Sequence, residues 1–469
     1  MLSTVNAIKN SITKAICLLW AITAIKTTAI AQPTKHVILI SIDGFHPDMY
    51  QDKSWPTSNL QELVKNGTSA DHMLSVFPSY TYPTHTAMVT GAFPARTGIS
   101  YNQPKGSKGD WNWFADAIKV PTLWQVLKQA GLPTAAVQWP VSVDRGRDIT
   151  NNVPEIWSDE HPNRITEARK YATPGLIEEL ELNATGKLDK YNMAEESFSM
   201  DDNSARMAAY IYRTKKPALL AVHFAEVDGA EHDHGRDGDS VRLAVQATDR
   251  CIGVILEAVA RSSMKDSTAV IVVGDHGFST IHTAFRPNML IKSLPARFTA
   301  AGGSAFLYLK DPVTPSPSKR RDQADRIVKA VTDSLNALPP DKRKLFRIID
   351  RKELDKMGAD SAAVMALSAV PGMVFSGSIT PTRVVNHGPG TLIQNNPLNG
   401  VFFPVSGGHH GYDPNTPEMY TGFIASGAGI GKGKTIREIR AVDIAPLIAK
   451  LLGVEFKTPD GKLPDGVIK

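Results

Sequence analysis

Three apolar runs in this sequence lead directly into residues that bind divalent metals. The runs and the residues that follow them are His36–Ile42 with Asp43, Ala218–Phe224 with Asp228, and Thr268–Val273 with Asp275 and His276. Two further histidines complete the set, His232 four residues after Asp228 and His410 in a glycine-flanked loop. Carboxylates and imidazoles without thiolates are typical of catalytic zinc, although manganese or iron would accept the same ligands. The pattern predicts a catalytic metal site.

A candidate nucleophile, Thr81, lies in the loop Phe77–His85. Pro83 is suited to the first turn of a helix, and Gly91 is suited to its end. Thr81 is therefore expected just before a helix N-terminus, where free N–H groups and the helix dipole favour an anion. A hydroxyl there can attack a phosphoryl group if its pKa is lowered.

The hydrophobic runs indicate which strands and helices carry these residues. Continuous rather than alternating apolar residues indicate strands buried on both faces of a parallel sheet. Helical patterns lie between the runs, at Leu123–Gly131 and at Ser240–Arg261. Alternating strands and helices predict an α/β fold with a largely parallel sheet, in which ligands bind beyond the carboxyl ends of the strands.

The pattern divides the chain into four parts. We expect a signal peptide (1–31), a first part of a catalytic α/β domain (32–285), a smaller α+β cap insertion (286–400) and a second part of the catalytic domain (401–469). In the cap, Phe306–Leu309 is expected to be a strand and Gln323–Leu338 a helix; afterwards Phe423–Gly427 and Ala441–Leu452 are expected to be a strand and a helix. Pro104–Gly109 and Pro315–Arg321 are expected to be exposed loops.

The N-terminus predicts export. Lys9 and Lys14 precede the apolar run Ala15–Ile25, and Ala29–Ala31 supplies a small-residue cleavage pattern. The run is about half of the roughly 20 residues that a spanning helix needs, so we expect no stable membrane anchor and a periplasmic or secreted bacterial protein. Cys251 is then the only cysteine of the mature chain, and its helical position suggests a buried small side chain rather than a catalytic thiol.

Composition narrows the range of partners. The chain has 469 residues, is 42% hydrophobic and 21% charged, and carries a formal charge of +5. Three of these charges are lysines of residues 1–31, which contain no acidic residue, so +2 remains. A nearly neutral, evenly charged chain gives no sign of a nucleic-acid-binding surface, and no protein partner can be inferred.

The other histidines have ordinary explanations. His36 and His85 are expected to be hydrogen-bonded structural residues, and His223, within an apolar run, is expected to be a core histidine. His234, His282 and His409 are expected on solvated loops.

Together these motifs resemble the type I phosphodiesterase / nucleotide pyrophosphatase family of the alkaline phosphatase superfamily. The resemblance runs over nearly the whole mature chain. The matching motifs are Asp43-Gly44, Thr81 in Phe-Pro-x-x-Thr-x-Pro, Asp228-x-x-x-His232, Asp275-His276-Gly277, His410-Gly411-Tyr412-Asp413, Trp139-Pro140 and Val442–Pro446. The resemblance implies an alkaline-phosphatase-like three-layer sandwich and selects His410 over His409 as a ligand.

The resemblance also implies a mechanism with two zinc ions. One ion would be held by Asp43, Thr81, Asp275 and His276, and the other by Asp228, His232 and His410. Thr81 would attack phosphorus and form a phosphothreonine, with the ions about 3.5–4 Å apart on the two axial oxygens. The substrate would be a small phosphate ester such as a nucleotide.

Two departures from the family bear on substrate choice. Thr84 stands where many members have asparagine, so it is a candidate phosphate contact with fewer donors. Val143–Gly146 partly resembles the Lys-Asp-Arg-Gly motif of a periplasmic monoesterase branch, with Arg145 retained and Val143 in place of the lysine. Arg145 is equally explained as a solvated loop residue paired with Asp144 or Asp148. Because Tyr80 or Tyr82 could stack on an aryl group, we predict hydrolysis of phosphodiester or nucleotide pyrophosphate bonds. The alternatives are a phosphomonoesterase, a phosphonate hydrolase, or an inactive binding relative.

Overall fold

A computed structural model describes residues 33–104, 109–144, 146–158, 163–194, 196–310, 317–379 and 400–469. The expected signal peptide, Arg145 and most of the expected loop Pro104–Gly109 lie outside the described residues. Among the described residues, no helix is long and apolar enough to cross a membrane.

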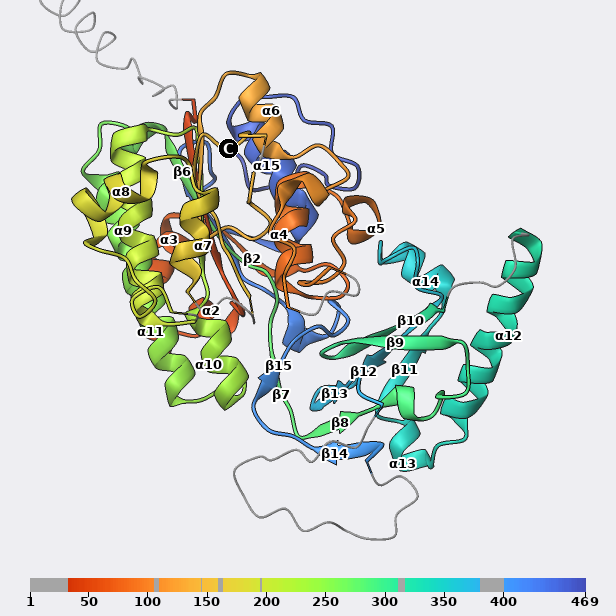
Figure 1. The fold of residues 1–469 in the computed structure, drawn as a ribbon. Helices are drawn as coiled ribbons and strands as arrows, with labels where there is room; N and C mark the ends of the chain where they lie inside the picture. Colours follow the sequence, from red (N-terminus) through yellow and green to blue (C-terminus); the bar gives the residue numbers. More distant parts are fainter. Residues whose placement is uncertain are drawn as a thin grey trace, which may run out of the picture. The chain divides into compact units, whose positions relative to one another are not determined.

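An eight-stranded sheet forms the centre of the fold (Figure 1). Its strands, in spatial order, are β17 (Lys434–Arg440), β2 (Gly67–Leu74), β16 (Phe423–Gly427), β6 (Thr268–Gly274), β1 (His36–Ile42), β5 (Leu219–Phe224), β3 (Thr134–Val137) and β4 (Asn151–Val153). The pairings are parallel except those of β16, which runs against β6 and β2. The predicted largely parallel sheet is confirmed.

The three runs that lead into metal-type residues are neighbours at the centre of this sheet. Ile42 at the end of β1 pairs with Phe224 of β5 on one side and with Gly274 of β6 on the other. The carboxyl ends of β1, β5 and β6 therefore lie level with one another, and the residues that follow them emerge at one edge.

The continuous hydrophobicity of β1 reflects helices on both faces. Ile38, Ile40 and Ile42 belong to one core, whereas Val37 and Leu39 belong to the other. Figure 1 shows the helices of the two layers. The first core includes side chains of α9 (Phe198–Lys215) and α11 (Asp239–Ala260), and the second includes those of α4 (Thr81–Thr90), α6 (Leu123–Gln129) and α15 (Ile444–Leu451). This is the predicted three-layer α/β fold.

A second, smaller sheet forms within the predicted cap. Its antiparallel strands are β11 (Phe346–Ile349), β12 (Met365–Ala369), β10 (Ser304–Leu309) and β9 (Ala296–Ala301). Helix α12 (Pro317–Asn336) contributes Val331 and Leu335 to its core. A three-stranded sheet of β13 (Met373–Phe375), β8 (Thr283–Phe285) and β14 (Phe402–Pro404) adjoins the expected boundaries at 286 and 400, which stay predictions.

Most predicted elements match to within a residue or two, but α12 does not. It begins at Pro317, so the expected loop Pro315–Arg321 is wrong over most of its length, because proline is tolerated in the first turn of a helix. The remaining helices are α2 (Asp48–Gln51), α3 (Ser58–Asn66), α5 (Pro94–Thr97), α7 (Arg164–Tyr171), α8 (Leu176–Leu180), α10 (Glu226–His234), α13 (Pro340–Arg343) and α14 (Arg351–Lys356), and the strands β7 (Ser279–Thr280) and β15 (Gly408–His409) pair with each other.

Candidate metal centre and active site

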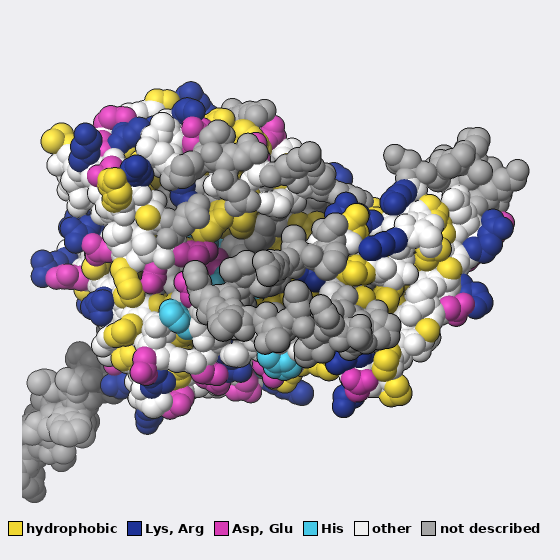
Figure 2. All heavy atoms as spheres, turned by 60° about the horizontal axis from the view of Figure 1, so that its bottom comes forward, with side chains coloured by type: hydrophobic (Ala, Val, Ile, Leu, Met, Phe, Trp, Pro, Cys, Tyr) yellow, Lys and Arg dark blue, Asp and Glu magenta, His cyan; other side chains and the backbone are white. Residues whose placement is uncertain are grey.

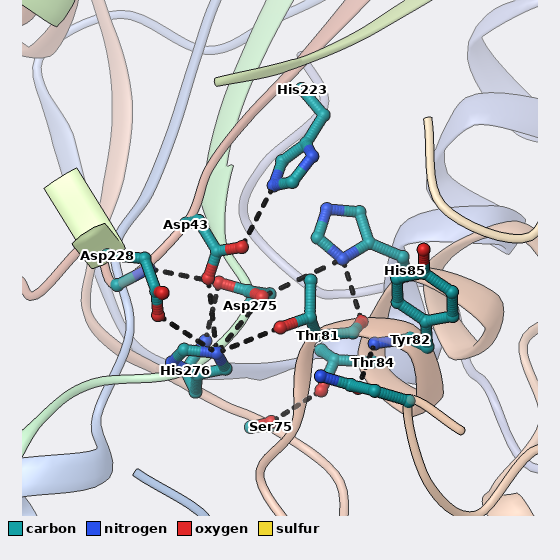
Figure 3. Close-up of polar contacts among 12 residues, drawn as sticks. Asp43, Ser75, Thr81, Tyr82, Thr84, His85, His223, Asp228, Asp275 and His276 are labelled. Atoms are coloured by element: carbon teal, nitrogen blue, oxygen red, sulfur yellow. Dashed lines mark hydrogen bonds and ion pairs between the residues drawn. The ribbon is translucent and has the colours of Figure 1, made fainter. Parts of the chain in front are cut away.

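A first group of potential metal ligands lies at the ends of β1 and β6. Asp43, Asp275 and His276 each offer one ligand atom, and these atoms all lie within 4.8 Å of one another. Nε2 of His276 lies 3.1 Å from Oδ1 of Asp43 and 3.4 Å from Oδ2 of Asp275. All three side chains are buried (Figure 3).

A second group shares His276 with the first. Asp228, His276 and His410 also offer ligand atoms within 4.8 Å of one another. The rings of His276 and His410 are stacked, with centroids 3.6 Å apart. Because the two groups have a residue in common, two ions bound here would be close neighbours.

Helix α10 explains the position of the remaining predicted ligand, His232. It starts two residues after β5 and places Asp228 and His232 one turn apart on the same side. Nε2 of His232 lies 3.3 Å from Oδ2 of Asp228, while Nδ1 donates to the carbonyl of Gly408 at 3.1 Å. His410 is fixed in the same way, because its Nδ1 donates to the carbonyl of Ser79 at 3.0 Å. Both rings therefore direct Nε2 toward Asp228.

Glycine allows the His410 loop to approach α10 closely. A Cβ atom on Gly408 would lie 2.3 Å from the carbonyl oxygen of Glu231, which is too short for any side chain. This is the close backbone approach that the glycine-flanked loop predicted.

Thr81 is the first residue of α4 rather than the residue before it. Its Oγ1 lies 3.3 Å from Nε2 of His276, the residue that both groups share (Figure 3). The helix ends as predicted at Gly91, which has a left-handed φ of 63°. The N–H of Tyr82 is already taken by Oδ1 of Asn102 at 3.0 Å, so fewer backbone donors are free for an anion than the sequence suggested.

These residues fit a bound cation. Oδ1 of Asp43, Oδ1 of Asp228 and Oδ2 of Asp275 are buried without a hydrogen-bond partner. Among the described residues, the ion pairs of these carboxylates are with histidines alone. Converging buried carboxylate oxygens with no Lys or Arg to balance them favour a divalent metal.

The pKa values of the three carboxyl groups differ with their surroundings. Burial, together with the carboxylates of Asp43 and Glu196, raises the pKa of Asp228 well above its ordinary value. Burial and Asp43 raise the pKa of Asp275 to about 7. Burial alone would also raise the pKa of Asp43, but His276 and His223 outweigh it and hold that pKa well below its ordinary value.

Two of the three predicted ligand histidines, His232 and His410, are favoured in the neutral form. Burial and the neighbouring His276 lower the pKa of His410 well below its ordinary value and also lower the pKa of His232. Burial would also lower the pKa of the third, His276, but the carboxylates of Asp275 and Asp43 outweigh it and raise that pKa. Neutral imidazole is the form that binds a metal.

A cavity of about 400 Å³ opens beside the metal groups. Its lining includes His410, His409, Tyr80, Trp111 and Asn102. The ring of Tyr80 is 4.8 Å from that of His410. Tyr82 is fully buried and donates its hydroxyl to Glu155 at 2.9 Å, so of the two tyrosines considered for stacking, only Tyr80 lines this cavity.

Thr84, the candidate phosphate contact, is fully buried. Its Oγ1 lies 2.8 Å from Oγ of Ser75 (Figure 3). Because the Thr84 side chain is fully buried, a bond from its hydroxyl to a phosphate would require this side chain to become accessible.

The remaining histidines mostly follow expectation. His36 and His85 each donate to a backbone carbonyl, and His234 and His282 are exposed. His409 is different: it is half-buried, lines the cavity, and its Nδ1 accepts the N–H of His410 at 3.0 Å. The expectation of a solvated loop is wrong for His409, because the loop folds back against α10.

Three residues near the site have contacts that the sequence did not predict. Asn102 lines the cavity, and no hydrogen-bond partner for its Nδ2 is found among the described residues. His223 is the buried core histidine that was expected, but its Nε2 also lies 3.1 Å from Oδ2 of Asp43. Glu155 lies 3.0 Å from the other ring nitrogen of His223. Of these three residues, only His223 could have been identified from the sequence, because a histidine is unusual inside a continuous apolar strand.

Comparison with known proteins identifies the family. The model of the family "Type I phosphodiesterase / nucleotide pyrophosphatase" matches residues 37–413. Similar proteins include ectonucleotide pyrophosphatase/phosphodiesterase family member 7 of Rattus norvegicus, which is 20% identical over 92% of this chain and 86% of its own length. Another is bis(5'-adenosyl)-triphosphatase enpp4 of Mus musculus, which is 24% identical over 95% of this chain and 84% of its own length.

Solved structures share the fold. Human ectonucleotide pyrophosphatase / phosphodiesterase 5 superposes with a TM-score of 0.63 and 18% identity, covering 91% of this chain and 97% of that one. An inactive form of the murine protein in complex with AMP has a TM-score of 0.60 and 19% identity, covering 90% and 96%. With the family model spanning most of its length, this chain belongs to the type I phosphodiesterase / nucleotide pyrophosphatase family.

Proposed function

We propose that this chain is a metal-dependent hydrolase of phosphodiester or nucleotide pyrophosphate bonds, with Thr81 as its nucleophile. The observation that carries the proposal is the position of the Thr81 hydroxyl, 3.3 Å from the histidine that belongs to both groups of potential ligands. Family membership supports the reaction class.

The residues that would hold two zinc ions are Asp43, Thr81, Asp275 and His276 for one, and Asp228, His232 and His410 for the other. When bound, such ions supply positive charge that lowers the pKa of a hydroxyl and stabilises charge on phosphoryl oxygens. Other divalent transition metals would suit the same ligands.

The chain itself orients both reactants. Helix α4 holds Thr81, and the donation from Tyr82 N–H to Asn102 fixes the Asn102 amide beside it. With Oδ1 engaged, Nδ2 of Asn102 is the donor available to a non-bridging phosphoryl oxygen. Attack by the deprotonated Thr81 oxygen on phosphorus forms a phosphothreonine as the bond to the leaving oxygen breaks, and the second substituent of a diester stays on phosphorus. Water then cleaves the ester between Thr81 and phosphorus.

The cavity supports a diester rather than a monoester. A monoester carries two negative charges, and the described residues that line the cavity include no Lys or Arg. They do include Tyr80 and Trp111, whose rings suit the second substituent of a diester, such as a nucleoside or aryl group. The AMP complex of the murine relative is in keeping with a nucleotide.

A small substrate also agrees with the surface charges. On the face shown in Figure 2, Lys and Arg side chains are interspersed with Asp and Glu. The described residues on this face form no continuous basic stripe of the kind that a nucleic-acid polymer would need.

The test is a substrate panel run with zinc present: nucleoside di- and triphosphates, dinucleotides, aryl diesters, aryl monoesters and phosphonates. We expect kcat/KM to be higher for bis-(p-nitrophenyl) phosphate than for p-nitrophenyl phosphate. A preference for the monoester above roughly tenfold, about 1.4 kcal/mol of transition-state discrimination, would contradict the proposal.

We also propose that the mature protein is periplasmic or secreted, on the basis of the N-terminal sequence pattern. Expression of the full chain in a bacterium should yield a processed protein in the periplasm or medium, beginning after Ala31. Recovery of the unprocessed chain in the cytoplasm alone would contradict this.

A further inference from the structure

We propose that His223 and Glu155 are positioning residues for Asp43, and that a hydrogen-bonded chain through them couples Asp43 to the helix that carries Thr81. The inference rests on the proposed function, because it treats Asp43 as a metal ligand.

The chain has four members in an unbroken row. Oδ2 of Asp43 lies 3.1 Å from Nε2 of His223, and Nδ1 of His223 lies 3.0 Å from Oε2 of Glu155. The other oxygen of Glu155, Oε1, accepts the hydroxyl of Tyr82 at 2.9 Å. All four residues are at most 5% exposed.

The chain assigns different tasks to the two oxygens of Asp43. Oδ2 is engaged by His223, so the carboxylate cannot rotate freely. Oδ1 takes no part in the chain and lies 3.1 Å from Nε2 of His276, another member of the first group of potential ligands. His223 therefore keeps Oδ1 turned toward the metal group, in the way that outer partners orient metal ligands in other proteins.

The Tyr82 end of the hydrogen-bonded chain lies next to the nucleophile. Tyr82 is the next residue after Thr81 in α4, and the Thr81 hydroxyl lies 3.3 Å from His276. Asp43 and Thr81 are thus held from two sides, through His276 across the metal group and through Glu155 behind it. The four members lie just after β1, in β5, just after β4 and in α4, so the hydrogen-bonded chain links four separate parts of the sequence.

A core histidine kept only for packing would behave differently. Each ring nitrogen of His223 lies within hydrogen-bond distance of a carboxylate oxygen, Nε2 at Asp43 and Nδ1 at Glu155. A side chain with a single donor can replace one of these bonds and not the other. The amide nitrogen of glutamine reaches the Nε2 position, whereas that of asparagine reaches only the Nδ1 position.

The experiment compares His223→Gln with His223→Asn. Zinc affinity is measured by competition with a chromogenic chelator, and the melting temperature is measured on the metal-free protein. His223→Asn should bind zinc about 10- to 100-fold more weakly, the usual cost of losing an outer partner, while His223→Gln, which keeps the bond to Asp43 and loses only the one to Glu155, should bind zinc no more than severalfold more weakly. His36→Gln, at the opposite end of β1, is the matched control and should bind zinc as wild type does.

Two further variants extend the test to the rest of the chain. Glu155→Gln, which keeps the shape of the side chain, should weaken zinc binding severalfold. It provides the alternative test if His223→Asn does not fold. Tyr82→Phe should lower kcat with little change in KM, because it loosens the start of the helix that carries Thr81.

The inference is overturned if His223→Asn and Glu155→Gln bind zinc as wild type does. It is equally overturned if Asn and Gln at position 223 weaken zinc binding alike and lower the metal-free melting temperature alike, since that result describes a packing role. Failure of the proposed function looks different: the wild-type chain would then bind no zinc or hydrolyse no phosphate ester.

Discussion

The role of Asn102 can be separated into two parts by substitution. Its Oδ1 accepts the N–H of Tyr82, which is a structural task at the start of α4. Its Nδ2, in the cavity, is proposed to donate to a phosphoryl oxygen. Asn102→Asp keeps the acceptor for Tyr82 and replaces the donor with a negative oxygen, whereas Asn102→Ala removes both.

The phosphate-binding role and the capping role of Asn102 predict opposite rankings of kcat/KM for these two variants. A carboxylate roughly 4 Å from a phosphoryl charge costs about 4 kcal/mol at an effective dielectric constant of about 20, which is about a thousandfold in kcat/KM. Loss of one hydrogen bond to a charged group costs about 1.5–3 kcal/mol, or about 10- to 150-fold. Asn102→Asp should therefore be the slower enzyme.

The assay is kcat/KM for bis-(p-nitrophenyl) phosphate, with zinc content and melting temperature as controls. If Asn102 serves only as a cap for α4, Asn102→Asp should be close to wild type and Asn102→Ala should be the damaged variant. Asn102→Asp at more than about a third of the wild-type kcat/KM, where the charge predicts a thousandfold loss, would refute the reasoning.

Three other outcomes follow from the same geometry. Tyr80→Ala should raise KM for aryl and nucleotide diesters by about tenfold, the value of an aromatic contact of about 1.4 kcal/mol, without changing zinc content; an unchanged KM would remove Tyr80 from the binding surface. Because the native pKa of Asp275 is raised to about 7, the metal-free protein should lose stability as pH rises from about 4 to 7, and zinc affinity should rise over the same range as the proton is displaced; a chelator titration that is flat between pH 5 and 8 would contradict this. Cys251 is buried and its pKa is raised to about 12, so iodoacetamide at pH 8 should label it only after unfolding; rapid labelling of the native protein would contradict the burial.

The parts of the fold that depend on periodicity could be predicted. His36–Ile42 is a strand with the expected bounds, because five of its seven residues are apolar, four of them β-branched, and such a segment has few other ways to be buried. The start of α12 could not be predicted, because the prolines near Pro317 are compatible with both a loop and a first helical turn.

The candidate ligands could be collected from sequence because each follows a strand or lies in a short motif. The residues that orient them could not, because their partners are remote in the chain: Glu155 is 68 residues from His223, and Asn102 is 20 residues from Tyr82. For the same reason, the choice between Tyr80 and Tyr82 needed the structure. Both are aromatic and flank Thr81, but only the contact with Glu155 shows that Tyr82 is committed to the interior.

The central claim is that Thr81 carries the phosphoryl group. Its most direct test is to quench turnover of bis-(p-nitrophenyl) phosphate in acid and to locate the covalent phosphoryl group by mass spectrometry of peptides. The account predicts the group on Thr81, and its absence in a Thr81→Ala variant that still binds zinc. Ser79, whose hydroxyl donates to the carbonyl of Tyr412 at 2.8 Å, is the neighbouring control, and Ser79→Ala should still be labelled on Thr81. A phosphoryl group on Ser79, or a Thr81→Ala enzyme that turns over near the wild-type rate, would contradict the account.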